Sequence, residues 1–464
     1  MLTLRAEQSE SLWDVVLPVG ARELPEDLAR IDALLGEEEL LWPIVERWRS
    51  EFEQTGRLVL SEGRPTIAME TFVRLMVLKA RYGWGYRTLV AEVSDSLHLR
   101  RFCRIGLSAR VPDESTVRKL TRRVGSEMVN EITRALIVKA CREKRFRGRA
   151  VRVDSTVVEA DVKHPTDSGL AAHGVRVLAR EGRKVAALLK DSKARVRDRS
   201  RAMGRVLRTI SRTLRRRTGE RKGEVLELTA KTGELLQQSI REARRLAEWA
   251  RARARGRGAK AKLAAANDLQ ELADRCERVV TQIKQRVAGE PITDRLVSLS
   301  DPDARPIRKG KAGKPTEFGY VTQICEVTEN TKRGARGLIL PSASAPGNPG
   351  ENALLPTTVT ELTRLQISPR EIALDGGFQR GPTSDSLAAL APERVFISGR
   401  QQPGSKRTQR RLQRYRTGAE GRISHLKRGY GMRRSRLKGN EGQRTWTGWG
   451  ILTYNLDTLA IRTG

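Results

Sequence analysis

Three acidic residues, Asp154, Asp375 and Glu420, are marked by their neighbours as candidates for chemistry. Asp154 interrupts the β-branched run VRVDSTVV, although aspartate is disfavoured inside strands. Asp375 follows the apolar run IAL and precedes two glycines. Ligands of open α/β sheets gather at such strand ends. Glu420 is the single carboxylate between Arg400 and Lys438, a stretch rich in lysine and arginine.

Convergent carboxylates of this kind suit phosphoryl transfer on nucleic acids. That reaction uses one or two Mg²⁺ ions, which activate the attacking oxygen and stabilise the leaving oxygen. Mg²⁺ prefers oxygen ligands and keeps several waters, so two or three carboxylates suffice. The chain has 89 basic and 55 acidic residues, and its formal charge of 89 − 55 = +34 attracts polyanions. We therefore expect a few functional acids inside a basic, polyanion-binding protein.

Two basic residues that would share a helix face with Glu420 strengthen it as a candidate functional residue. If residues 415–428 are helical, Arg416, Glu420 and Lys427 lie on one stripe, because each residue turns about 100° around the axis. The alternative is an ordinary ion pair between Arg416 and Glu420, which stabilises a helix by roughly a few tenths of a kcal/mol.

The other acids and the histidines have ordinary explanations as well. Asp154 fits an edge strand or a turn, and Asp375 fits a common Asp-Gly turn. Four rival acids are typical of turns or caps because proline or polar residues flank them: Asp161, Asp167, Asp301 and Asp303. His164 and His425 are candidates for substrate contact, with surface histidines as the alternative.

Residues 1–145 are predicted to form an all-helical, DNA-binding domain. Apolar residues recur there at three- and four-residue spacings. Pro112 and Asp113 suit the start of a basic helix that carries Arg118 and Arg122. A helix-turn-helix module would place these arginines against DNA. A helical bundle with solvated arginines is the alternative.

The rest of the chain predicts an α/β fold that is interrupted by a long helical insertion. Residues 146–174 begin with the strand-like RAVRVDSTVVEADV, and residues 175–290 are Arg-rich with helical spacing. Residues 291–464 alternate strands and helices, which is typical of a mixed sheet flanked by helices. RARARGRGAKAK suits a turn between two antiparallel helices of the insertion. Its arginines either contact phosphate or form a solvated surface.

Several other classes of protein are disfavoured. No run of about 18 apolar residues predicts a membrane span, and the first residues lack the pattern of a secretion signal. The four cysteines are far apart and form no CxxC pair, so we expect reduced thiols in a cytoplasmic protein rather than a zinc site or a disulfide framework.

The motifs together resemble a DDE transposase of a bacterial insertion sequence, in the heterogeneous group called ISNCY. The resemblance rests on VDSTVVEADVKHPTDSGL around Asp154, on IALDGGF around Asp375 and on the basic segment around Glu420. DPDARPIRKGKAGKPTEFGY and TGWGILTYNLDTLA are also similar to this group. Apart from the insertion, the similarity covers most of residues 60–460. It implies an RNase H-like catalytic core.

This resemblance implies a role for each acid. Asp154, Asp375 and Glu420 would hold two Mg²⁺ or Mn²⁺ ions. Activated water would cut the ends of the element and free a 3′-OH, which would then attack target DNA. The resemblance also implies double-stranded DNA as partner, a homodimer on that DNA, and a place in the bacterial cytoplasm in association with the nucleoid.

The C-terminal signature of related families runs Tyr, two residues, Arg, three residues, Glu, six residues, Lys. Arg416, Glu420 and Lys427 fit this spacing, and the resemblance implies that Arg416 and Lys427 contact DNA phosphates. Gln413 stands at the tyrosine position, with Tyr415 two residues later, so the chain departs from the signature there. A non-enzymatic nucleic-acid-binding protein and a nuclease without strand transfer are the alternative functions.

Overall fold

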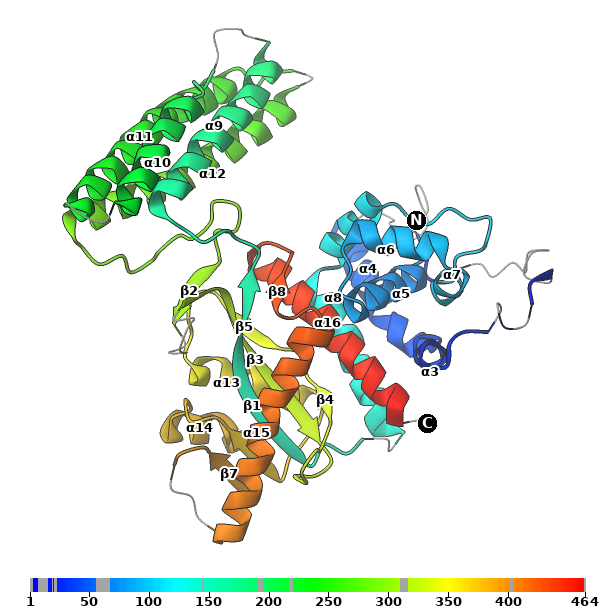
Figure 1. Cartoon of the computed structure of the whole chain (residues 1–464). Coiled ribbons are helices and arrows are strands. Elements are labelled where there is room, and N and C mark those ends of the chain that lie inside the picture. Colours follow the sequence, from blue (N-terminus) through cyan, green and yellow to red (C-terminus); the bar gives the residue numbers. More distant parts are fainter. Residues whose placement is uncertain are drawn as a thin grey trace. The chain divides into compact units, whose positions relative to one another are not determined.

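The computed structural model describes most of the chain as two compact units. The first unit comprises Met1–Asp161 and Gly319–Gly464, and the second comprises Val162–Phe318 (Figure 1). The described residues are 3–6, 16–18, 20, 23–55, 67–143, 146–190, 195–216, 220–256, 258–308, 316–400 and 404–462. None of the described helices is both long and apolar enough to cross a lipid bilayer.

The N-terminal part of the first unit is helical. Its helices are α3(Glu26–Leu35), α4(Glu38–Thr55), α5(Met69–Arg81), α6(Tyr86–Asp95), α7(Leu97–Phe102) and α8(Glu114–Arg142). Their apolar faces share one core with α16(Gly439–Arg462), in which Phe72 meets Trp449 edge to face at 5.7 Å. The three- and four-residue spacing of the sequence corresponds to these buried faces.

Helix α8 consists of two segments. Asp113 caps the first segment by accepting hydrogen bonds from the backbone of Ser115 and Thr116. Gly125 breaks the helix with a φ of +69°, a value that favours glycine. Glu441 of α16 then caps the second segment, because its carboxylate accepts from the Ser126 backbone N–H at 2.6 Å.

A mixed sheet lies at the centre of the first unit, which confirms the α/β class. β1(Ala150–Ala160) is antiparallel to β3(Thr316–Thr328) and parallel to β6(Glu371–Leu374), and β6 is parallel to β7(Arg394–Ile397). Three short strands extend these pairings: β4(Leu338–Ile339) and β5(Ala343–Ala345) pair with β3, and β8(Arg434–Ser435) pairs with β1.

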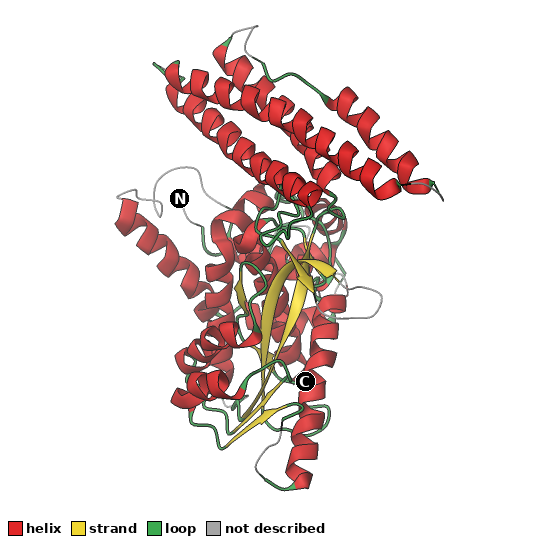
Figure 2. Cartoon of the chain, turned by 90° about the vertical axis from the view of Figure 1, so that its left-hand side faces the viewer, coloured by secondary structure: helices red, strands yellow, loops and turns green. Residues whose placement is uncertain are grey.

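Helices cover both faces of this sheet (Figure 2). Val151 and Val153 of β1 share a core with Leu355 of α13(Glu351–Arg364). Because side chains alternate along a strand, Ala150 points to the other face, where it packs with Tyr415 of α15(Lys406–Gly429). α14(Arg380–Leu387) and the short η1(Ala388–Leu390) connect β6 to β7. Arg152 and Asp154 therefore lie on the face covered by α15.

The second unit is a helical bundle. It contains α9(Asp167–Leu189), α10(Ser200–Arg215), α11(Arg221–Ala252), α12(Ala259–Ala288) and the strand β2(Arg305–Arg308). A Cβ at Gly174 of α9 would lie 2.8 Å from Leu236 of α11, so this glycine allows close packing of the two helices. The compact unit spans 162–318, a wider range than the 175–290 expected for the insertion. The loop between α11 and α12 falls at the expected turn.

Candidate active site

The register of the sheet brings Asp154 and Asp375 together. Val153 of β1 pairs with Leu374, the last residue of β6, and an aspartate follows each of these partners. β1 continues to Ala160, while β6 ends, so β1 loses this neighbour at Asp154. The Asp154 carboxylate also accepts a hydrogen bond from the Ser155 backbone N–H at 2.7 Å.

Glu351 joins the two aspartates as a third carboxylate. Ligand oxygens of Asp154, Glu351 and Asp375 all lie within 4.8 Å of one another. Glu351 is the first residue of α13, and a Cβ at Gly377 would be only 3.1 Å from its carboxylate carbon. Gly377 therefore leaves room for the glutamate beside Asp375.

Glu351 was not among the candidate residues expected from the sequence. It follows the Pro/Gly-rich stretch SAPGNPG and has no apolar strand before it, so the signal that marked the aspartates is absent. An acid in the first helical turn is common, because it interacts favourably with the helix dipole. The position of Glu351 directly after a glycine-rich loop was the one sequence feature that could have marked it as a candidate site residue.

The acidic group has the composition and spacing of a site for a hard divalent cation. Oxygen ligands of Mg²⁺ lie at about 2.0–2.1 Å from the ion, so they are at most about 4.2 Å apart. The ligand oxygens of the acidic group, within 4.8 Å of one another, are close to that spacing. Asp154 is 8% exposed, whereas the side chain of Asp375 is 38% exposed, so the site has a buried base and an open side.

Glu420 is linked to this group through the guanidinium of Arg416. Arg416 of α15 donates through Nη1 to Asp375 and through Nη2 to Glu420, at 2.8 Å in each case. The Arg416 side chain is nearly buried, while that of Glu420 is 60% exposed. Two of the three expected ligands thus converge directly, and the third is linked to them through Arg416. The role of Glu420 as a metal ligand stays a prediction.

A buried ionic network fixes α15 against the sheet. Glu326 of β3 lies between Arg152 of β1 at 2.6 Å and Arg422 of α15 at 2.9 Å. Arg152 also donates to the backbone oxygen of Tyr415 at 2.9 Å. A Cβ at Gly418 would overlap the Arg152 guanidinium, so the close approach requires glycine at this position. The network therefore positions the helix that carries Arg416 and Glu420.

The remaining predicted DNA contacts lie on two helices of the first unit. Lys427 is half-buried on α15. Arg118 and Arg122 are exposed on the first segment of α8, and Arg118 lies 3.8 Å from Glu114. Exposed arginines on a short capped helix are compatible with both the DNA-binding and the solvated-surface interpretations.

None of the four rival acids belongs to the acidic group within the part of the chain that the structure describes. Asp161 lies 3.8 Å from Arg434, and Asp167 forms ion pairs with Arg286 and Arg295 in the second unit. Asp301 is buried in the second unit.

The two candidate histidines pack against aromatic rings. His425 lies edge to face with Tyr430 and Tyr454, and burial, followed by nearby arginines, lowers its pKa. His164 meets Phe318 edge to face at 5.5 Å in the second unit.

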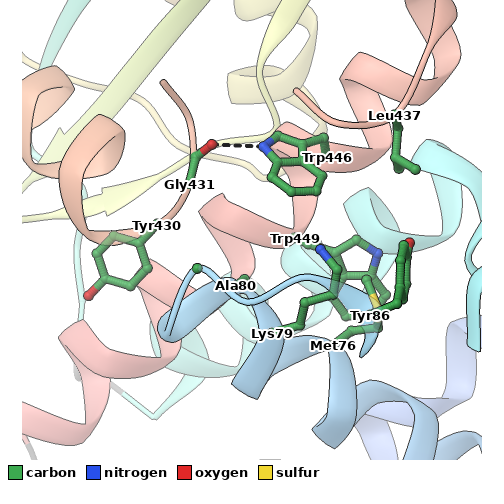
Figure 3. Close-up of a pocket in the computed structure, with 10 residues that line it drawn as sticks. Met76, Lys79, Ala80, Tyr86, Tyr430, Gly431, Leu437, Trp446 and Trp449 are labelled. Carbon is green, nitrogen blue, oxygen red and sulfur yellow. Dashed lines mark hydrogen bonds between the residues drawn. The ribbon is translucent and has the colours of Figure 1, made fainter. Parts of the chain in front are cut away.

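A separate hollow in the first unit is aromatic rather than acidic (Figure 3). Trp446 lines it and donates to the Gly431 backbone oxygen at 2.8 Å. The Lys79 ammonium lies 4.1 Å from the Trp446 ring centre and 4.8 Å from that of Tyr86. Burial, followed by the charge of Arg436, lowers the pKa of Lys79 to about 7. This hollow is part of the packing between α5 and α16.

The N-terminal helices are similar to a known protein family. Residues 24–123, from α3 to the first segment of α8, match the family model of a transposase domain (DUF772). The chain is also 26% identical over 178 residues to the uncharacterized protein ORF8 in the nfe locus of Rhizobium meliloti, which covers 37% of this chain and 86% of that protein. No solved structure matches at a significant level. The domain match supports a transposase family for this chain.

Proposed function

We propose that the chain is a DDE transposase with an RNase H-like catalytic core, and that the acidic group at the ends of β1 and β6 is its active site. The observation that carries the proposal is the convergence of Asp154, Asp375 and Glu351, which are distant in the sequence, in a chain of charge +34. The transposase domain match at residues 24–123 supports the same class of function.

Asp154 and Asp375 would hold the divalent ions, with Glu351 and Glu420 as further carboxylates around them. When bound, Mg²⁺ or Mn²⁺ supplies activation of the attacking oxygen and stabilisation of the leaving oxygen. Water attacks the phosphorus atom, the bond to the 3′ oxygen breaks, and that oxygen leaves as a 3′-OH. In strand transfer, this 3′-OH attacks a target phosphate and displaces the target's own 3′ oxygen.

Arg416 would change partners during this reaction. In the structure its two terminal nitrogens are used by Asp375 and Glu420. Divalent ions at the carboxylates would compete with the guanidinium, and the released Arg416 could pair with a DNA phosphate in bidentate fashion. The exposed Glu420 would then be able to turn toward the ions. Lys427, Arg118 and Arg122 would contact double-stranded DNA elsewhere, in a homodimer that pairs the two ends.

The experiment is incubation of the full chain with DNA that carries the terminal repeats flanking its gene, with Mg²⁺ or with EDTA. We expect cleavage at the repeat ends that EDTA abolishes and that Asp375→Asn loses by about 100-fold or more. Joining of the freed 3′ ends to a second DNA distinguishes a transposase from a nuclease. Binding without any metal-dependent cleavage would favour a non-enzymatic DNA-binding protein.

A further inference from the structure

Helix α10 of the second unit carries a stripe of arginines along one face. Arg201, Arg205, Arg208, Arg212 and Arg215 recur at alternating spacings of four and three residues, and all are exposed. At about 100° and 1.5 Å per residue, they span roughly 80° of the helix surface and about 21 Å of its length. These five residues are called the α10 stripe below.

Packing fixes the direction in which the α10 stripe points. Met203, Ile210 and Thr213 are buried and lie on the opposite face of the helix. Met203 belongs to the apolar core that α10 shares with α9, α11 and α12. Because the apolar face is held against the bundle, the α10 stripe is directed to solvent.

Four arginines of the α10 stripe differ from several other arginines of the bundle, because no ion pair joins them to an acid among the described residues. Over the described residues 195–216 and 220–256 and the rest of the second unit, no carboxylate lies within 4.0 Å of the guanidinium groups of Arg205, Arg208, Arg212 or Arg215. By contrast, Arg199 pairs with Glu242 at 2.6 Å and Arg244 with Asp274 at 2.9 Å. α10 itself contains no acidic residue.

An uncompensated stripe is unfavourable for the helix alone, because like charges three and four residues apart repel each other. The arrangement becomes favourable when a polyanion with regularly spaced charges lies along it. Arginine pairs with phosphate through two parallel N–H donors, and duplex DNA repeats its phosphates every 3.4 Å per strand. The α10 stripe, about 21 Å long, can therefore reach several phosphates of a duplex.

We propose that the α10 stripe binds the phosphate backbone of duplex DNA, independently of base sequence. The helical bundle would thus extend DNA binding beyond the acidic site and the N-terminal domain. The choice of DNA rather than another polyanion rests on the proposed function, whereas the location of the surface rests on α10 alone.

The test compares the full chain with the quadruple variant R205Q/R208Q/R212Q/R215Q. Glutamine keeps the helix propensity high while it removes the charge. The matched control, R180Q/R183Q/R244Q/R278Q, removes the same charge from the same unit at arginines that pair with carboxylates. Binding of a 30-bp duplex unrelated to the terminal repeats is followed by fluorescence anisotropy over a range of salt concentrations. Circular dichroism verifies that each variant is folded.

We expect the slope of log affinity against log salt concentration to fall by about 3 to 4 in the stripe variant, because each phosphate contact contributes about 0.9. The control should change the slope by less than about 1. Equal slopes in the wild type and the stripe variant would overturn the proposal, as would equal losses in both variants. A loss seen with duplex RNA but not with DNA would overturn it in favour of RNA.

The cleavage assay keeps this result separate from that of the proposed function. If the salt dependence of affinity is reduced in the stripe variant but the wild type never cuts DNA, DNA binding by the α10 stripe is supported and the transposase proposal fails. If the wild type cuts DNA and the stripe variant has the same salt dependence of affinity as the wild type, the transposase proposal is supported and the inference about α10 fails.

Discussion

Arg416 donates a hydrogen bond to Asp375 over 2.8 Å, and this contact joins α15 to the carboxyl end of β6. A cation bound to Asp375 would compete with this guanidinium for the carboxylate. Arg416 thus compensates part of the negative charge of the acidic group. The contact would make metal binding and the position of α15 interdependent.

Arg416→Ala should bind Mn²⁺ several-fold to about tenfold more tightly than the wild type, because it lacks the competing positive charge. The same variant should cut DNA more slowly, because the proposed phosphate contact is lost. Isothermal titration with Mn²⁺ measures the first effect. Arg414→Ala, which removes an exposed charge from the same helix, is the control. Weaker Mn²⁺ binding by Arg416→Ala would contradict the competition.

Glu351→Gln should weaken Mn²⁺ binding about tenfold, because it removes one of three converging carboxylates while it keeps the side chain's shape. The same titration measures this change. Asp385→Asn removes an exposed carboxylate of α14 that is outside the acidic group and should leave the affinity unchanged. Identical affinities for Glu351→Gln and the wild type would exclude Glu351 from the metal site.

Gly418→Ala should destabilise the first unit by about 1–3 kcal/mol, because the added methyl group overlaps the Arg152 guanidinium in a packed interior. Gly421→Ala, on the same helix with no atom within 4 Å of its Cβ, should instead stabilise by up to about 1 kcal/mol. Chemical denaturation gives both free energies of unfolding. Equal effects of the two substitutions would show that Arg152 does not constrain α15 at Gly418.

The lowered pKa of Lys79 should make the stability of the fold depend on pH. Its pKa in the folded chain is about 7, below the usual 10.5, so between these values the unfolded chain holds a proton that the folded chain has lost. The contribution of Lys79 therefore destabilises the fold below about pH 7, and stability rises with pH toward 10.5. Lys79→Met should be more stable than the wild type by an amount on the order of a few kcal/mol near pH 6.

The advantage of Lys79→Met should shrink steadily up to pH 10. Urea unfolding of both proteins at pH 6, 8 and 10 measures it. A difference in unfolding free energy that stays constant over this range would mean that Lys79 titrates as an ordinary exposed lysine.

The sequence indicated part of the site because two of its acids break a local pattern. Asp154 interrupts a β-branched run and Asp375 ends an apolar one, and the sheet register then places them side by side. Glu351 broke no pattern, since acids are frequent at helix starts. The pair of Arg416 and Glu420 followed from helical spacing, but the contact of Arg416 with Asp375 depends on how α15 packs on the sheet.

For the fold as well, local sequence patterns predicted the elements but not the contacts between distant residues. The alternation of strands with helices was sufficient to predict the α/β class. Gly418 and Gly421 do not interrupt α15, which is continuous from Lys406 to Gly429. The physical reason for Gly418 is Arg152, which is far away in the sequence and reaches α15 only in the folded protein.

The most direct test of the central claim is a change of metal preference at Asp375. A cysteine thiolate binds Mn²⁺ better than it binds Mg²⁺, because Mg²⁺ requires hard oxygen ligands. Folded Asp375→Cys should lose cleavage of the terminal-repeat DNA by about 100-fold in Mg²⁺ and regain at least a tenth of wild-type cleavage in Mn²⁺. Cleavage by Asp375→Cys in Mg²⁺ at the wild-type rate would contradict the claim that this carboxylate binds the catalytic metal.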